Sequence, residues 1–225
     1  MGLVFLDTIV TRVFAPAGAV GFALIAQRRG WGVLNSIELP GWVQLLMTLL
    51  LLDLAIYLQH RLFHYVPLFW RLHRVHHADL DFDVTTGIRF HPVEILLSLG
   101  IKFVVIVALG APPLAVLAFE VSLNATSLFN HSNVRIPSWL ERILRFIVVT
   151  PDMHRVHHSI DRRETDSNFG FNFPWWDRLF RTYRPQPKAG HQGMTVGIEQ
   201  FRDPKELLLH RMLLQPVRND RAESP

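Results

Sequence analysis

Histidine is the residue type whose number and spacing in this chain point to chemistry. Twelve of the 225 residues are histidine, and ten of them lie between residues 60 and 158. The sequence His-Arg-Val-His-His occurs twice, at 73–77 and at 154–158, and a His-xxx-His pair occupies 60–64. The ten candidate metal ligands are His60, His64, His73, His76, His77, His91, His131, His154, His157 and His158.

The spacing of these histidines suits a helix that presents metal ligands. Positions i, i+3 and i+4 of a helix span an arc of about 100°, so each HxxHH sequence can direct three imidazoles at one site. Imidazole binds zinc, copper, iron and nickel. A zinc site takes only three or four protein ligands, so eight to ten histidines fit two metals with about four imidazoles each. Soluble di-iron bundles use glutamates together with ExxH sequences, and this chain contains no ExxH sequence.

The amino-acid composition excludes several other kinds of site. The chain has no cysteine, which excludes disulfides, thiolate zinc sites and cysteine-ligated iron–sulfur clusters. Its net charge of +4 comes from interspersed acidic and basic residues, so we expect no nucleic-acid partner. A histidine pH switch or a buried hydrogen-bonded network remains an alternative, although a switch rarely needs ten histidines in repeated ligand spacing.

Four apolar stretches surround the histidines, at roughly 3–26, 41–59, 92–109 and 114–130. Each approaches the length of about 20 residues that crosses a bilayer. We therefore predict an all-α membrane bundle of about four helices with a helical cap that carries the metal site. The alternatives are a soluble all-α protein and a first stretch that only dips into the membrane.

The topology of such a bundle places all ten histidines on one face of the membrane. The regions 60–91 and 131–225 share that face and hold 19 of the 23 lysines and arginines. The positive-inside rule makes this face cytoplasmic. We treat 1–225 as one domain, in which 184–225 is a linker followed by a surface helix, and expect an amphipathic surface helix near 138–149.

Three polar residues are candidates to orient the ligands by hydrogen bonding, since imidazoles on metals commonly need such partners. Asp53 lies seven residues, about two helical turns, before His60. Asp152 precedes the second HxxHH sequence and could equally be a helix N-cap. Asn130 could hold a ligand or line a substrate cavity. His191 and His210 lie outside the motifs and are expected on the surface.

These residues resemble the fatty acid hydroxylase/sterol desaturase superfamily of integral-membrane di-iron oxygenases, and most of all its sterol-desaturase-like branch. The resemblance runs from about Asp53 to Tyr183. The matching segments are HRLFH, WRLHRVHH, TTGIRFHPVE, NHSNVRIPSWLE, TPDMHRVHHS, ETDSNFG and WWDRLFRTY. One departure is Ser127, which stands four residues before His131 where some members have a second histidine.

The resemblance implies a four-helix membrane base, a cytosolic cap and two iron ions that activate O2 against an unactivated C–H bond of a lipid. The expected product is an alcohol or an alkene of a fatty acyl, sterol or isoprenoid chain. The matching motifs imply that the eight histidines of the HxxxH and HxxHH sequences are metal ligands. They imply the same role for His131 and, with less support, for His91. No catalytic residue beyond the metal ligands is expected. Electrons would come from a separate donor, such as a cytochrome b5-like protein, a ferredoxin or a reductase.

Other functions remain open for the same histidines. A membrane transition-metal transporter would need ligands along a path through the bilayer. A zinc hydrolase would need fewer ligands. A haem carrier would place axial histidines within facing helices. Zinc could also replace iron in the purified protein, because histidine sites accept both metals.

Overall fold

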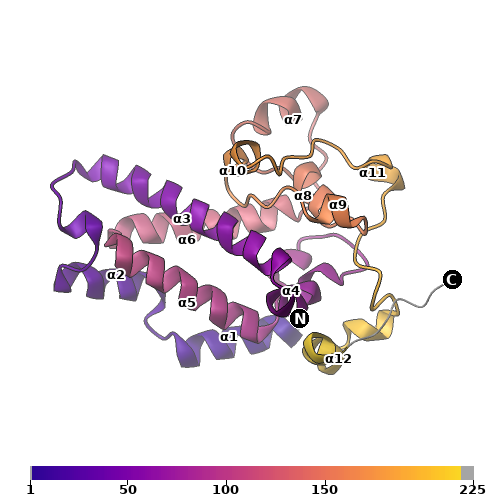
Figure 1. The fold of residues 1–225 in the computed structure, drawn as a ribbon, viewed down its shortest axis with the longest axis horizontal. Helices are drawn as coiled ribbons and strands as arrows, with labels where there is room; N and C mark the ends of the chain where they lie inside the picture. Colours follow the sequence, from indigo (N-terminus) through magenta and orange to yellow (C-terminus); the bar gives the residue numbers. More distant parts are fainter. Residues whose placement is uncertain (1, 219–225) are drawn as a thin grey trace.

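The computed structural model describes residues 2–218, and within that range the fold is helical and contains no strand (Figure 1). Short 3-10 turns lie at Val33–Asn35, Thr86–Ile88, Pro204–Leu207 and Gln215–Val217. The α-helices are α1 (Gly2–Phe14), α2 (Gly18–Arg29), α3 (Gly41–Tyr65), α4 (Pro67–His77), α5 (Pro92–Leu109), α6 (Pro113–Asn130), α7 (Ser138–Leu144), α8 (Pro151–His157), α9 (Arg162–Thr165), α10 (Trp175–Leu179), α11 (Gly190–Gly193) and α12 (Leu209–Leu214).

Four helices begin with proline, whose nitrogen needs no hydrogen-bond partner at the first helical position. Pro67, Pro92, Pro113 and Pro151 start α4, α5, α6 and α8. The surface helix expected within 184–225 begins after Asp203 as a 3-10 turn and becomes α-helical only at α12.

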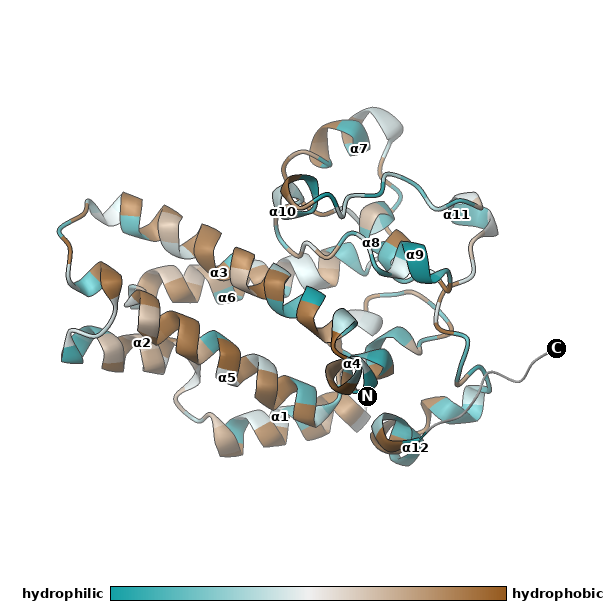
Figure 2. Ribbon diagram, viewed as in Figure 1, coloured by the Kyte–Doolittle hydropathy of each residue, from teal (hydrophilic) through white to brown (hydrophobic). Residues whose placement is uncertain are grey.

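The apolar stretches form one end of the molecule. Among residues 2–218, three helical segments are long and apolar enough to cross a membrane: Gly2–Arg29, Gly41–Tyr65 and Pro92–Leu109. The fourth expected stretch is α6, which packs against α2 and α3 but carries more polar side chains, including Glu120 and Asn124. Hydrophobic residues dominate these helices, whereas α4, α8 and α9 are more polar (Figure 2).

The first segment consists of two helices rather than one. A turn around Pro16 separates α1 from α2, and the chain then runs away from the N-terminus, which lies beside α4 (Figure 1). The apolar core of the bundle joins α2, α3, α5 and α6 through small and large side chains that interlock. Its buried members are Ala19, Ala23, Leu52, Ile106, Ala111, Val116 and Phe119.

Two glycines bring the connecting loops together at the end of the bundle far from the histidines. Gly110 ends α5 in the left-handed conformation (φ 67°) and leads directly into the turn before α6. Gly32 has φ 92°, and a Cβ atom on it would lie 2.1 Å from the nitrogen of Gly110. The α2–α3 and α5–α6 connections therefore meet backbone to backbone.

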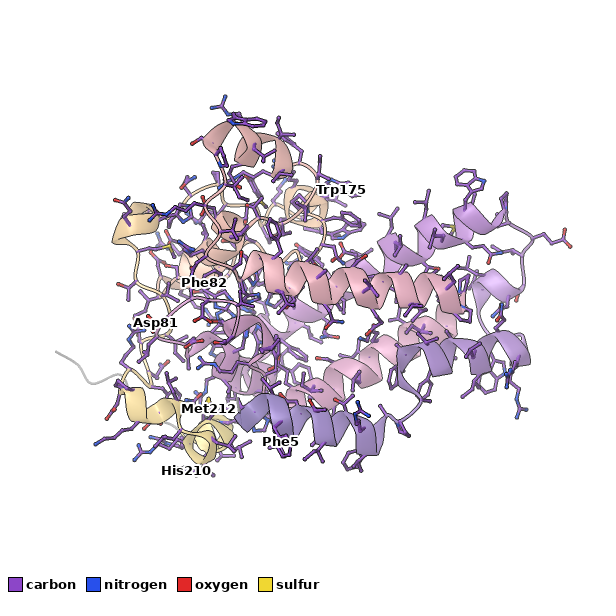
Figure 3. All side chains as sticks on the ribbon, turned by 180° about the vertical axis from the view of Figure 1, so that it is seen from behind. Phe5, Asp81, Phe82, Trp175, His210 and Met212 are labelled. Atoms are coloured by element: carbon purple, nitrogen blue, oxygen red, sulfur yellow. The ribbon has the colours of Figure 1, made fainter. Side chains whose placement is uncertain are left out.

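The remaining elements form a cap at the histidine end. The amphipathic helix expected near 138–149 is α7, which is shorter than predicted, and Trp139 and Ile143 on it are exposed. On the other side, α12 packs against the start of α1 and α4 through Leu3, Val75 and Met212 (Figure 3).

The contact between Gly32 and Gly110 gives a prediction about stability. Gly32→Ala should lower the melting temperature of the detergent-solubilised protein by several degrees, about 2 kcal/mol or more, because the new Cβ has no space and alanine disfavours this φ. Gly41→Ala is the matched control, since nothing lies within 4 Å of the position that its Cβ would take and its φ is ordinary. An equal effect of the two substitutions would contradict the close approach of the loops.

Candidate metal centre

Nine buried histidines form two adjacent groups where α3, α4, α6 and α8 meet. Within each group, the candidate ligand nitrogens lie within 4.8 Å of one another. The five-histidine group consists of His60, His64, His73, His77 and His157. The four-histidine group consists of His76, His131, His154 and His158.

Each HxxHH sequence divides its ligands between the two groups. On α4, the i and i+4 histidines enter the five-histidine group while His76 at i+3 enters the other. On α8 the assignment is reversed, because His157 at i+3 joins the five-histidine group. At 100° per residue, position i+3 points about 100° away from position i+4, so one helix can serve two neighbouring sites. The expectation that all three imidazoles share a site is therefore corrected: they share a pair of sites.

The imidazole rings are held by oxygen acceptors at Nδ1. Within the described part of the chain, six of the nine histidines make such a contact, and it fixes the ring orientation. The contacts run from His60 to Phe169 O (2.9 Å), His64 to Asp166 Oδ1 (3.2 Å), His73 to Glu94 Oε1 (2.7 Å), His76 to Arg89 O (3.2 Å), His131 to Ser127 O (2.7 Å) and His157 to Ser167 O (2.8 Å).

The opposite nitrogens face one another. The Nε2 atoms of His60 and His73 are 3.1 Å apart, and those of His76 and His131 are 3.3 Å apart. A carbonyl or carboxylate oxygen only accepts hydrogen bonds, so each of these four rings donates through Nδ1 and carries a lone pair on Nε2. Facing lone pairs repel, whereas two nitrogens that share an ion at about 2.1 Å lie about 3.0 to 3.4 Å apart. The donor set therefore fits bound metal.

Burial keeps the imidazole rings of the candidate ligands in the neutral form. His77 and His158 stack where the groups adjoin, with ring centroids 4.5 Å apart, and neither ring has a hydrogen-bond partner among the described residues. Burial and the neighbouring histidines lower the pKa of both rings well below the ordinary value. Burial lowers the pKa of His157 to about 3 and that of His131 to about 4. Neutral imidazole is the form that binds metal, so the fold holds these ligands ready.

The structure does not bring His91 into either group. His91 is the N-cap of α5, where its Nδ1 accepts a hydrogen bond from the backbone nitrogen of Val93 at 3.2 Å. Its Nε2 lies 3.4 Å from the carbonyl oxygen of Leu213. His91 thus connects the start of α5 to the C-terminal segment. It can do so because it is the N-cap residue, which lies at the boundary of the helix directly before Pro92.

Asp53 makes no hydrogen bond to a histidine in the described chain. Its buried carboxylate accepts hydrogen bonds from the backbone and side chain of Asn172, the backbone of Phe173 and the indole of Trp176. Two turns of helix carry it away from the metal centre, and it holds the segment that follows Phe169 instead. Asp53 therefore acts on the ligands only through that segment.

The other two candidates also differ from expectation. Asn130 is buried and donates to the carbonyl oxygen of Phe171 at 3.3 Å, so it supports the same segment. Asp152 has a side chain that is 41% exposed and faces His191 at 3.9 Å rather than the metal centre. It is not the N-cap of α8 either, because Thr150 occupies that position.

Comparison with known proteins supports a functional role for the two histidine groups. The profile of the fatty acid hydroxylase family matches residues 45–182, which include all nine histidines of the two groups. This chain belongs to the fatty acid hydroxylase family.

Curated relatives extend the match. Ornithine lipid hydroxylase of Rhizobium tropici is 30% identical over 69% of this chain and 47% of its own length. Alkylglycerol monooxygenase of Xenopus tropicalis is 30% identical over 82% of this chain and 41% of its own length. Human cholesterol 25-hydroxylase is 32% identical over 62% of this chain and 51% of its own length. The chain thus spans about half the length of these relatives, and no solved structure matches it.

Sequence reasoning missed two carboxylates that hold ligands in this member of the fatty acid hydroxylase family. Glu94 contacts His73, and Asp166 contacts His64. In the sequence, Glu94 stands out only as an ionisable residue in an apolar stretch, although a carboxylate in the first turn of a helix at the histidine end is a usable signal. Asp166 lies in ETDSNFG, a polar segment whose fold depends on contacts remote in sequence.

Bound metal should depend on both groups. His157→Ala removes a ligand from the five-histidine group, and His76→Ala removes one from the four-histidine group. Each variant should hold fewer than about two metal ions per chain, because one imidazole that would bind the ion of its group is gone. Elemental analysis of protein purified with added iron measures this. His210→Ala is the control at an exposed position, and unchanged metal in both group variants would contradict the assignment.

Asp177 is a buried residue that holds the ligand-supporting segment in place. Its carboxylate accepts hydrogen bonds from the backbone nitrogens of Phe169 and Gly170, both at 2.8 Å, and from Thr182 Oγ1 at 2.7 Å. Burial raises its pKa to about 6. It thereby places the carbonyl oxygen that holds His60.

Asp177→Ala should lower both stability and metal content. The substitution leaves two buried backbone donors unpaired, at about 1 to 3 kcal/mol for each group. A thermal melt in detergent and elemental analysis together measure the effect. Asp152→Ala, at an exposed acid, should leave both unchanged, and a stable variant with full metal would show that the segment needs no such support.

Proposed function

We propose that this protein holds a pair of iron ions on its two histidine groups and uses O2 to hydroxylate or desaturate a C–H bond of a membrane lipid. The relatives described above are named as lipid hydroxylases and monooxygenases, which supports oxidation of a lipid. The observation that carries the proposal is a cavity that joins the histidines to the apolar helices.

The cavity has a volume of about 470 Å³ and lies between α1, α3, α5 and α6. His60 and His73 line one end of it, and Ile56, Leu99 and Leu123 line its apolar walls. Pockets of this size accommodate small ligands. Thr8, Arg12 and Asn124, which are exposed on the bundle, also line the cavity, so it reaches the bundle surface from which a lipid chain would enter.

The residues of the chain have distinct roles in this proposal. When bound, a pair of iron ions supplies the redox chemistry that couples reduction of O2 to oxidation of a C–H bond. The histidines hold that pair, and the oxygen acceptors at Nδ1 keep six of the nine rings in the tautomer that leaves Nε2 free. The apolar walls exclude water and hold the chain beside the metal end, which favours reaction at one position.

Electron supply and orientation also belong to the proposal. We expect electrons from a separate protein, cytochrome b5-like, ferredoxin or reductase. The cap carries most of the basic residues, and the positive-inside rule places such a face in the cytoplasm. The electron donor would then reach the metal centre from the cytoplasmic side.

The test is O2-dependent oxidation of lipids by the purified protein in nanodiscs. Iron-loaded protein, a reductase and total membrane lipid should yield products that have gained one oxygen atom or lost a pair of hydrogens, detected by mass spectrometry. Oxygen-18 gas should label the hydroxylated products. We expect no product without O2 or from the double variant His76→Ala, His157→Ala.

Other results would favour the competing functions. Protein that binds only zinc and cleaves esters without O2 would favour a hydrolase. Metal that crosses sealed vesicles in a histidine-dependent way would favour a transporter, although both histidine groups lie at one end of the bundle. A Soret band would indicate a haem protein. Each of these outcomes would replace the oxygenase proposal.

A further inference from the structure

The metal end of the cavity carries polar side chains from three different helices. Asp7 of α1, Gln59 of α3 and Glu94 of α5 all line it. Gln59 directly precedes His60, and Glu94 Oε1 lies 2.7 Å from His73 Nδ1. Glu94 thus contacts a histidine that lines the cavity, and Asp7 and Gln59 line the same cavity.

These side chains present oxygen atoms without partners. Among the described residues, Asp7 Oδ1 and Oδ2, Gln59 Oε1 and Glu94 Oε2 are buried and have no hydrogen-bond partner. Asp7 is 8% exposed and Glu94 is 3% exposed. Buried carboxylates without partners are costly, and ionisable groups that face a cavity inside a membrane bundle commonly mark a ligand path. All four atoms are acceptors, so the matching ligand group is a donor.

The cations of the cavity lie farther from the histidines. Lys102 is eight residues, about 12 Å, along α5 from Glu94, and Arg12 is about 8 Å along α1 from Asp7. Lys102 already pairs with Glu120 at 2.6 Å. An anionic head group would therefore find its counter-charge away from the metal end, whereas a hydroxyl or ammonium group finds acceptors beside it.

We propose that Asp7 and Glu94 form a recognition site for a hydroxyl or ammonium group on the head of the substrate lipid. The head group then lies at the metal end of the cavity, and the chain extends along Ile56, Leu99 and Leu123. Oxidation consequently falls on a carbon near the head group rather than near the chain terminus. This inference rests on the proposed lipid oxidation, but its binding part can be tested without turnover.

The test compares four probes that share a sixteen-carbon chain: hexadecan-1-ol, hexadecylamine, methyl hexadecyl ether and hexadecanoate. Each competes with a diazirine-bearing hexadecanol for photo-crosslinking to the iron-loaded protein in nanodiscs, and peptide mass spectrometry locates the crosslinks. The alcohol and the amine should displace the label at concentrations about ten-fold or more below those of the ether and the carboxylate, because only they can donate a hydrogen bond to the unpartnered oxygens.

Variants assign the preference to residues. Asp7→Asn keeps the shape but replaces one acceptor oxygen with an NH2 donor, and should reduce the preference for the amine over the ether about ten-fold or more. Asp203→Asn is the matched control, because Asp203 is an exposed N-cap and asparagine caps equally well. Glu94→Gln is a second variant and is analysed with its metal content, since Glu94 also contacts His73.

The outcomes separate this inference from the proposed function. An ether that competes as well as the alcohol and the amine, a preference for hexadecanoate, or a preference unchanged in Asp7→Asn would overturn the recognition site. A donor preference that depends on Asp7 supports the site even when no probe is oxidised, a result that counts against the proposed function alone. Oxidation confined to the chain terminus would overturn the predicted position of attack.

Discussion

Imidazole lone pairs that meet at about 3 Å repel one another unless a cation lies between them. The arrangement of the histidine rings in the cap depends on this interaction. His60 faces His73 and His76 faces His131 in this way, far from solvent. A protonated ring in such a place would lose its hydration, so burial favours neutral rings. The fold thus holds its ligands in the one state that metal can stabilise, and metal binding would contribute directly to the stability of the folded protein.

The segment from Asp166 to Phe173 connects the histidine rings to the rest of the molecule by hydrogen bonds. Oxygen atoms of this segment hold rings from both α3 and α8. The segment is held in turn by Asp53 of the membrane bundle and by Asp177 of the cap. Neither aspartate contacts a histidine, yet both determine where the acceptors lie. The metal centre therefore joins bundle and cap through one loop with many hydrogen bonds.

The position of the metal centre also explains the chemistry proposed for it. The histidines lie where the apolar helices end, and the same cavity contacts both His60 and the walls that α3, α5 and α6 provide. A lipid can keep its chain in apolar surroundings while its polar end approaches the cap. The four unpartnered acceptor atoms of Asp7, Gln59 and Glu94 add a polar boundary at the point where chain and cap meet.

Local spacing and composition determined much of this protein before the structure did. Apolar length predicted the bundle, and helical spacing showed that the HxxHH histidines could converge. These features depend on neighbours a few residues apart. Tertiary structure alone decided that each HxxHH serves two groups, that His91 caps α5, and that Asp53 holds a loop. It also placed Asp7 on the same cavity as Glu94, 87 residues away in sequence, because such pairings depend on how helices pack and not on local periodicity.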